Sequence, residues 1–497
     1  MIPLSFAQSR IWFLNQLDGG AGYRIPLAYR LHGELDHCAL SEAIADVVER
    51  HESLRTVFPE ADGQPHQVVL DADSARPPLP VVVRSEAELG DALRAAAGHV
   101  FDLTTEIPLR AHLFRLGARE HVLLVLLHHI AADGWSLTPL LDELAAAYTA
   151  RRAGRAPHWD PLPVQYADYT LWQNELLAAE DDPESLAGEQ LAYWRRQLDG
   201  LPDCLALPAD RPRPPVASHR GGTAPVSLGP DTHRRLLALA RQEKASLFMA
   251  LQAGVVALLT RLGAGTDIPV GSAIAGRTDE ALDGLIGMFV NTLVLRTDAA
   301  GDPTFRELLG RVREVDLDAY AHQDLPFERL VDVLRPERSA AWNPLFQVML
   351  VLEDGPEQTP RLPGLTAVEE PVDGDSAKFD LALHLRERAP DPELAPAGLY
   401  GNLDYALDLF DPPTAVALVT GGPGWWRRRW PTPTCGSAAF PSSRPASGRG
   451  CWRAVPVAGC RRGRVLPRCP ASSRNRPPAL RTRPRWWRAA RFSATGS

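Results

Sequence analysis

The sequence predicts a mixed α/β fold in two halves for residues 1–420 of the 497-residue chain. Three observations lead to this prediction. Short apolar runs of strand length alternate with longer segments of helical period. A proline-rich segment, "LALPADRPRPPVASHRGG" at residues 205–222, separates two such sets of elements and is predicted to be extended. From residue 421 onward, neither a helical nor a strand period remains.

The first half shows clear element signals. Residues 35–58 are predicted to form a helix with Asp36 as its N-cap. Residues 121–127, "HVLLVLL", form a continuous apolar run that is typical of a strand buried on both faces. A second helix is predicted to have its cap at Thr138, a proline in its first position, and its end before Gly154.

The second half repeats the same kinds of pattern. A long, largely buried helix is predicted at residues 246–265, and a helical segment with a break at Pro326 is predicted at residues 305–334. The predicted strands are residues 268–278, 287–298, 344–353 and 378–387.

The charge of the chain is unevenly distributed. The net charge is −8, but residues 421–497 contain 17 Arg and no Asp, Glu, Lys or His, which leaves 36 Lys and Arg against 61 Asp and Glu in residues 1–420. A body with a net charge of −25 argues against nucleic-acid binding. No apolar run approaches the ~18 residues of a membrane span, and the N-terminus lacks the features of a signal peptide. We therefore expect a cytoplasmic protein without a membrane segment.

The tail at residues 421–497 is rich in Arg, Pro and Trp. Its six tryptophans do not suit ordinary disorder, and its four cysteines, spaced 16, 9 and 9 residues apart, do not match a zinc site. GC-rich DNA read in a shifted frame encodes such a composition. Our hypothesis is that this tail is out of frame and disordered, and the alternative is a basic arm for nucleic acid or a membrane.

Two histidines and an acidic residue follow the apolar run, in the segment "HHIAADG" at residues 128–134. Successive side chains on a strand point to opposite faces, so His128 and His129 are not expected to converge on one metal ion. Asp133 lies too close in sequence to complete a three-ligand site. We expect no metal here. On spacing alone, a pair of core histidines bonded to backbone groups is the alternative to a functional site.

The segment at residues 128–134 matches the HHxxxDG motif of the condensation domains of nonribosomal peptide synthetases, within the chloramphenicol-acetyltransferase-like superfamily. Six further segments resemble the other blocks of that family in the same order, so that the resemblance covers residues 2–420. They are "SFAQSRIWFLNQL" (5–17), "RHESLRTVF" (50–58), "YADYTLWQ" (166–173), "IGMFVNTLVLR" (286–296), "HQDLPFERLVD" (322–332) and "NPLFQVML" (343–350).

The resemblance implies an α+β sandwich of two chloramphenicol-acetyltransferase-like halves, arranged as a V-shaped pseudo-dimer around a central substrate tunnel. Residues 1–175 would form the first half with the HHxxxDG loop, and residues 176–420 would form the linker and the second half. The implied reaction is attack of an acceptor aminoacyl amine on a donor acyl or peptidyl thioester. Both substrates would be carried on the 4'-phosphopantetheine of peptidyl carrier proteins, with no cofactor bound by the domain itself and an adjacent adenylation domain as a further partner.

Roles for the two histidines and Gly134 follow from the resemblance. His129 would lie in the tunnel, either as the base for the ammonium of the tetrahedral adduct or as the group that orients the amine. His128 is expected to point into the protein and to be structural. Gly134 is expected to adopt a tight backbone conformation and to leave room for a pantetheine arm.

Asp133 would pair with an arginine and hold the loop. Arg277 and Arg55 are the two candidate partners, with Arg50 behind them, and the alternative is a surface carboxylate that caps the turn. Asn343 would donate a hydrogen bond to the substrate, or else serve as a turn residue before a proline. Trp135 is expected to pack rather than to contact substrate.

Several subtypes and alternatives stay open. The run "DGWSL" differs from the "DxxSW" of epimerisation domains, and the Asp-based motif of heterocyclisation domains is absent. The opening segments favour an L-donor and L-acceptor class over a D-donor or fatty-acyl starter class. The alternatives are a non-catalytic recruitment module of the same fold and an inactive fragment. The second rests on a sequence that starts at the first motif and loses sense near residue 420. We expect the missing closing segment to leave a sheet edge or a core face exposed, with aggregation as the consequence.

Overall fold

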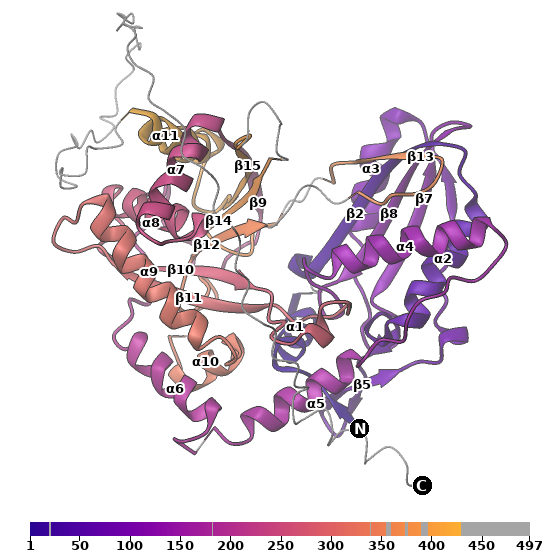
Figure 1. Ribbon diagram of the computed structural model, residues 1–497, viewed down its shortest axis with the longest axis horizontal. Coiled ribbons are helices and arrows are strands. Elements are labelled where there is room, and N and C mark those ends of the chain that lie inside the picture. The colour runs from indigo at the N-terminus through magenta and orange to yellow at the C-terminus, as the bar shows by residue number, and fades with distance from the viewer. Residues whose placement is uncertain are drawn as a thin grey trace, which may run out of the picture. The chain divides into compact units, whose positions relative to one another are not determined.

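The structure is a computed structural model that describes residues 1–18, 21–180, 182–337, 339–353, 359–372, 376–388 and 396–428, the last eight by their backbone alone. Two large sheets and a small one organise these residues, with helices packed on the sheets (Figure 1). The mixed α/β fold in two halves is therefore confirmed.

The sheet of the first half has the strand order β13-β2-β8-β7-β6. Its strands are β2 (Arg24–Gly33), β6 (Val81–Val83), β7 (Leu109–Arg115), β8 (Glu120–His128) and β13 (Leu365–Glu369). Helices α2 (His37–Arg50) and α4 (Leu137–Arg152) lie across this sheet, and α3 (Glu86–Ala97) packs on it as well (Figure 1). Leu123 and Val125 of β8 pack in the cluster that contains α2 and α4, whereas Val122 and Leu124 pack with α3. The prediction of a strand buried on both faces is confirmed.

The first predicted helix starts where the sequence indicated, because the Asp36 carboxylate accepts a hydrogen bond from the Ala39 amide (3.0 Å). Its predicted extension to residue 58 is wrong. After α2 the chain forms η2 (Glu52–Arg55) and β3 (Thr56–Val57). The cause is a long-range contact: the buried His51 lies 2.6 Å from Glu143 of α4 and accepts a hydrogen bond from the Ile286 amide, which outweighs the helical pattern.

The second predicted helix begins two residues earlier than expected. Ser136, not Thr138, is the N-cap of α4, and the Leu140 amide donates to the Ser136 carbonyl (3.1 Å). Past its end, Gly154 has a φ of +71°, the left-handed conformation in which glycine commonly ends a helix.

A small sheet and three helices complete the region around residues 1–200. The small sheet contains β1 (Ile2–Pro3), β3, β4 (Glu60–Ala61) and β5 (Gln64–Val69). The helices are α1 (Phe6–Asp18), α5 (Tyr166–Leu177) and α6 (Leu186–Gln197), and a short turn, η1 (Ala21–Tyr23), follows α1.

The sheet of the second half has the strand order β11-β10-β12-β14-β15-β9. Its strands are β9 (Gly221–Leu228), β10 (Asp267–Ile274), β11 (Asn291–Asp298), β12 (Val348–Glu353), β14 (Leu381–Glu387) and β15 (Leu399–Ala406). The helices of this half are α7 (Pro230–Gln242), α8 (Leu247–Arg261), α9 (Phe305–Ala321), α10 (Phe327–Leu334) and α11 (Pro412–Arg428). The predicted break at Pro326 is confirmed. The predicted strand at residues 287–298 starts only at Asn291, because residues 287–290 bond to the first half instead.

The two halves share a strand. β13, which lies late in the chain, pairs antiparallel with β2 in the sheet of the first half, with Leu365 opposite Gly33 and Glu369 opposite Tyr29. Backbone pairing thus joins the second half to the first, and side chains from both halves meet around the loop after β8.

Helix α9 contains a buried acid that is expected to make the stability of the second half pH-dependent. Asp316 and Gln252 of α8 are both 0% exposed, and burial raises the pKa of Asp316 to about 7. This pKa lies above the usual value of 3.8, so the folded state holds the proton more tightly than the unfolded state does. The stability that the bound proton contributes is therefore lost as pH rises from about 3.8 to about 7. We expect the free energy of unfolding of Asp316→Asn, relative to that of the wild type, to rise by about 2–4 kcal/mol from pH 5 to pH 8.

Urea unfolding at the two pH values would measure this difference. The exposed Asp318 on the same helix offers a matched control, since Asp318→Asn should follow the wild type at both pH values. An equal change in the free energy of unfolding between the two pH values for Asp316→Asn and the wild type would contradict the prediction.

In the part of the chain that the structure describes, no single helix is long and apolar enough to cross a membrane; α7 and α8, bent by 105°, pass such a test only as a pair and only by length and composition. The backbone of α11 continues through Arg428. Residues 429–497, to which most of the hypothesis of an out-of-frame tail applies, lie outside the described residues.

Candidate active site

The two histidines stand at the end of β8. His128 is its last residue, is 1% exposed, and accepts a hydrogen bond at Nδ1 from the Ile130 amide (3.2 Å). His129 follows the strand, and its amide donates to the Tyr23 carbonyl (2.8 Å). His129 is half-buried, and its ring meets the Tyr23 ring edge-on, with 6.4 Å between centroids. His128 is therefore in the core, whereas His129 is half-buried.

The surroundings of both imidazoles favour the neutral form. Burial, Arg24 and Lys378 lower the pKa of His128 to about 3. Burial, followed by the positive charge of Lys378 and the neighbouring His128, lowers the pKa of His129 well below 6.5. At neutral pH the His129 ring is thus uncharged, which suits a hydrogen-bonding role and makes it a weak base.

Asp133 is fully buried and joins the loop to the second half. One carboxylate oxygen accepts hydrogen bonds from the amides of Phe289 (2.9 Å) and Val290 (3.2 Å), and the other accepts from the amide and hydroxyl of Ser136 (2.8 Å each). The alternative of a surface carboxylate is therefore wrong. Asp133 holds the HHxxxDG loop against residues 287–290 by satisfying buried backbone donors.

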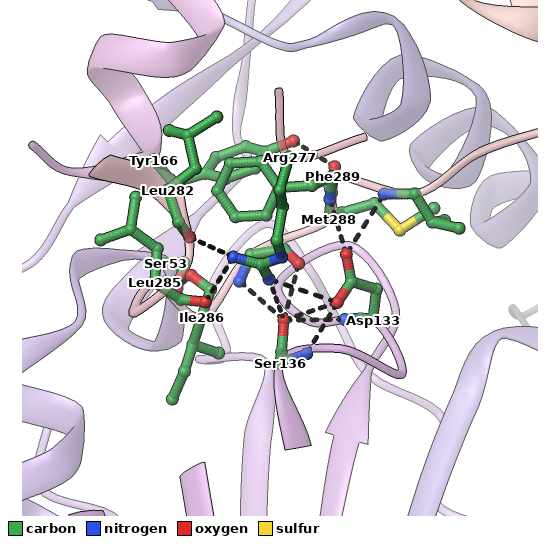
Figure 2. Close-up of polar contacts among 12 residues, drawn as sticks. Ser53, Asp133, Ser136, Tyr166, Arg277, Leu282, Leu285, Ile286, Met288 and Phe289 are labelled. Atoms are coloured by element: carbon green, nitrogen blue, oxygen red, sulfur yellow. Dashed lines mark hydrogen bonds and ion pairs between the residues drawn. The ribbon is translucent and has the colours of Figure 1, made fainter. Parts of the chain in front are cut away.

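Arg277 is the arginine that the fold brings to Asp133. Its Nη2 lies 3.5 Å from the carboxylate, and its guanidinium carbon lies 4.2 Å from the centroid of the Phe289 ring. Figure 2 shows the guanidinium between the Asp133–Ser136 turn and the carbonyls of Leu282 and Leu285, to both of which it donates. Charge and hydrogen bonds together fix the loop from the second half.

Ser136 is a residue of this network that the sequence interpretation missed. Its hydroxyl lies within hydrogen-bonding distance of Asp133, of the Gly287 backbone and of Arg277 Nη2 (3.2 Å) (Figure 2). The signal was present in the sequence, because a serine three residues after an aspartate is a common partner for local side-chain to backbone bonds. Tyr166, which donates to the Met288 carbonyl (2.7 Å), extends the same network.

The other arginines considered as partners of Asp133 lie elsewhere. Arg55 donates to the Leu70 carbonyl and pairs with Glu52 (3.5 Å), so it belongs to the neighbouring turn. Arg50 pairs with Glu143 (2.8 Å). Arg50 is the last residue of α2 and Arg55 ends the short turn after it, and these pairings hold both side chains away from the loop.

Gly134, Trp135 and Asn343 have different surroundings. Gly134 lies in a bend, although its φ is not positive, and a Cβ placed there would meet nothing within 4 Å, so the backbone borders open space. Trp135 is half-buried. The Asn343 side chain donates to the Lys378 carbonyl, which favours a structural role over a substrate contact.

No group of three or more His, Cys, Asp or Glu within the described ranges has an arrangement that could hold a metal ion.

The chain belongs to the condensation-domain family, since the sequence model of that family matches residues 1–420. A "Dimodular nonribosomal peptide synthase" of Bacillus subtilis (strain 168) is 56% identical over 420 residues, which are 84% of this chain and 18% of that protein. The "Probable non-canonical nonribosomal peptide synthetase (NRPS) CymA" of Salinispora arenicola is 55% identical over 419 residues, 84% of this chain and 5% of that protein. The chain thus spans less than a fifth of these relatives.

Solved structures give the same family. The X-domain from teicoplanin biosynthesis superimposes with a TM-score of 0.81 at 37% identity, covering 88% of this chain and 96% of that one. The X-domain in the complex with OxyB superimposes with a TM-score of 0.78 at 38% identity, covering 85% and 92% of the two chains. The fold is that of nonribosomal peptide synthetase condensation domains.

Proposed function

We propose that this chain forms an amide bond between a donor acyl or peptidyl thioester and the amine of an acceptor aminoacyl thioester, each carried on the phosphopantetheine of a carrier protein. The observation that carries the proposal is a neutral, partly accessible His129 on a loop that is locked to both halves and bordered by open space at Gly134. Membership of the condensation-domain family supports it.

The chemistry needs a positioned amine and a stabilised adduct. The neutral amine of the acceptor attacks the donor carbonyl carbon, the carbonyl oxygen gains negative charge, and the thiolate of the donor arm leaves as the amide forms. A neutral imidazole at His129 can accept a hydrogen bond from the attacking N–H and so orient it. The space beside Gly134 would admit a pantetheine arm, and the backbone amide of Gly134 would face the developing oxyanion.

Asp133, Ser136 and Arg277 would not touch the substrates. Their network sets the position of the loop, because it bonds the loop to residues that lie about 150 positions later in the chain. Partners implied by this reaction are an upstream donor and a downstream acceptor carrier protein, together with an adjacent adenylation domain.

The test is a condensation assay on the purified chain with a donor-loaded and an acceptor-loaded carrier protein. Intact mass spectrometry of the acceptor carrier is expected to show the mass of the joined product. A reaction with the donor carrier left unloaded is the control. A folded, monodisperse chain that gives no joined product with several L-configured pairs would overturn the proposal.

A second candidate function is the recruitment of a partner protein. It is favoured by the high structural similarity to an X-domain that was solved in complex with OxyB. In this case the chain would bind a partner enzyme and bring it to a carrier-linked peptide without condensing substrates. The condensation assay would then give no product, although the chain would still bind the partner enzyme. The presence of His129, Asp133 and Gly134 together favours catalysis.

We also propose that residues 421–497 are an out-of-frame tail, so that the in-frame sequence of the domain stops near residue 420, within α11. The family match, which ends at residue 420, is consistent with this boundary. Resequencing the gene tests it, and an uninterrupted frame through the codons of the tail would contradict it.

A further inference from the structure

Lysine is almost absent from this chain. Only Lys244 and Lys378 occur among its 53 basic Lys and Arg residues. Lysine and arginine carry the same charge but differ in one respect that matters for chemistry, because a lysine in a suitable environment can lose its proton near neutral pH and an arginine cannot. Both lysines are exposed, but they lie in different places: Lys244 lies just after α7, whereas Lys378 lies by the loop after β8.

The backbone on both sides of Lys378 is held firmly. The Ala377 amide donates to the His219 carbonyl (2.9 Å), and Asp380 pairs with Arg213 (2.9 Å). Phe379 stacks on Phe346, with 5.2 Å between ring centroids. The side chain of Lys378 thus starts from a fixed point in the second half.

From this point the side chain reaches into the first half. Its stem runs over Gly22, where an added Cβ would meet the Lys378 carbons at 3.6 and 3.7 Å. Its amine lies 5.0 Å from the centroid of the Tyr23 ring, the same ring that meets His129 edge-on. The stretch of chain that carries Tyr23 therefore contacts both the imidazole and the amine, and Lys378 is still accessible to solvent.

The environment of the amine makes proton exchange possible near neutral pH. Surrounding protein atoms and then the positive charge of Arg10 lower the pKa of Lys378 to about 8. The titratable or charged groups that face it in the described residues are Arg10, Tyr23, His128 and His129, and Arg10 is itself paired with Glu328 (3.3 Å). By contrast, the low pKa of His129 makes that ring a poor acceptor of protons.

We propose that Lys378 is the proton carrier of the condensation reaction, which takes the proton released by the attacking amine and returns it to the departing thiolate. This inference rests on the proposed function. In the step, the C–N bond forms and the resulting ammonium passes one proton to the neutral Lys378 amine. The C–S bond then breaks, and the thiolate of the donor arm receives that proton. The net result is an amide and a free thiol, with His129 orienting the amine.

The first measurement follows the ionisation of Lys378 directly. Protein labelled with ¹³C at the lysine ε carbon gives two lysine signals, and Lys378→Arg identifies one by removing it. Titration by NMR is expected to give this signal a midpoint near pH 8, with Lys244 as the internal reference for the folded state. A midpoint above about pH 10, the ordinary range of lysine, would overturn the inference whether or not the chain is active.

The second measurement separates proton transfer from charge. Lys378→Arg keeps the positive charge but does not release its proton, so we expect kcat to fall by about 100-fold with KM for both carriers little changed. The matched variant Lys244→Arg should behave as the wild type. Wild-type kcat in Lys378→Arg would overturn the inference while leaving the proposed function intact. Absence of product with the wild-type chain would instead remove the proposed function, and this inference with it.

If arginine disturbs the fold, which the Lys244 signal and the unfolding midpoint would reveal, Lys378→Met provides the same activity readout. Methionine keeps an unbranched stem for the contact with Gly22 and lacks the amine. A folded Lys378→Met protein with wild-type kcat would likewise overturn the inference, and a loss that matches Lys378→Arg would support it.

Discussion

Asp133→Ala is expected to lower the free energy of unfolding by about 3–5 kcal/mol, the range found when one partner of a buried charged network is removed. The variant leaves the amides of Phe289, Val290 and Ser136 without their acceptor and leaves the Arg277 guanidinium, whose side chain is 5% exposed, without its carboxylate. The amides of Phe289 and Ser136 and the guanidinium would stay buried without their present partner. Loss of the loop position should also abolish condensation.

Urea unfolding at pH 7 measures this effect. Asp142→Ala, which removes an exposed carboxylate from α4, is the matched control and should stay within about 0.5 kcal/mol of the wild type. If both variants unfolded at the same urea concentration as the wild type, the Asp133 network would not hold the halves together as described.

Replacing His129 is the second change with a large expected effect. We expect His129→Ala to lower kcat for condensation by about 100-fold or more, and His129→Gln to retain a larger share of the rate. The reason is that the ring is neutral and acts by hydrogen bonding, a capacity that the glutamine amide partly preserves. Because the pKa of His129 lies well below 6.5, the rate should not fall through an imidazole titration near that pH.

Single-turnover condensation followed by mass spectrometry between pH 6 and pH 9 would measure both variants. His128→Gln is a useful comparison, because that ring is buried in the core and its loss should affect stability more than kcat. Equal, complete loss in His129→Ala and His129→Gln, together with a separate midpoint near pH 6.5 in the wild-type rate profile, below the one expected near pH 8 for Lys378, would show that His129 is a base after all.

The arrangement of the loop shows how far a sequence can be interpreted. The buried strand before the histidines and the cap at Asp36 followed from the period of the side chains and from local hydrogen bonding. These are properties of neighbouring residues, and the structure confirms them. The boundaries failed where a distant contact intervened, as at His51, where Glu143 and Ile286 end the helix.

The sequence by itself determined the family, the mixed α/β halves and the residues of the HHxxxDG loop, because motifs and periods are written along the chain. Only the tertiary structure decided which arginine meets Asp133, since Arg277 is 144 residues away and Arg55 was an equal candidate by sequence. It also decided the ionisation of His129 and brought Lys378 beside Tyr23. Desolvation and charge pairing depend on atoms that fold together from distant segments, and no local pattern specifies them.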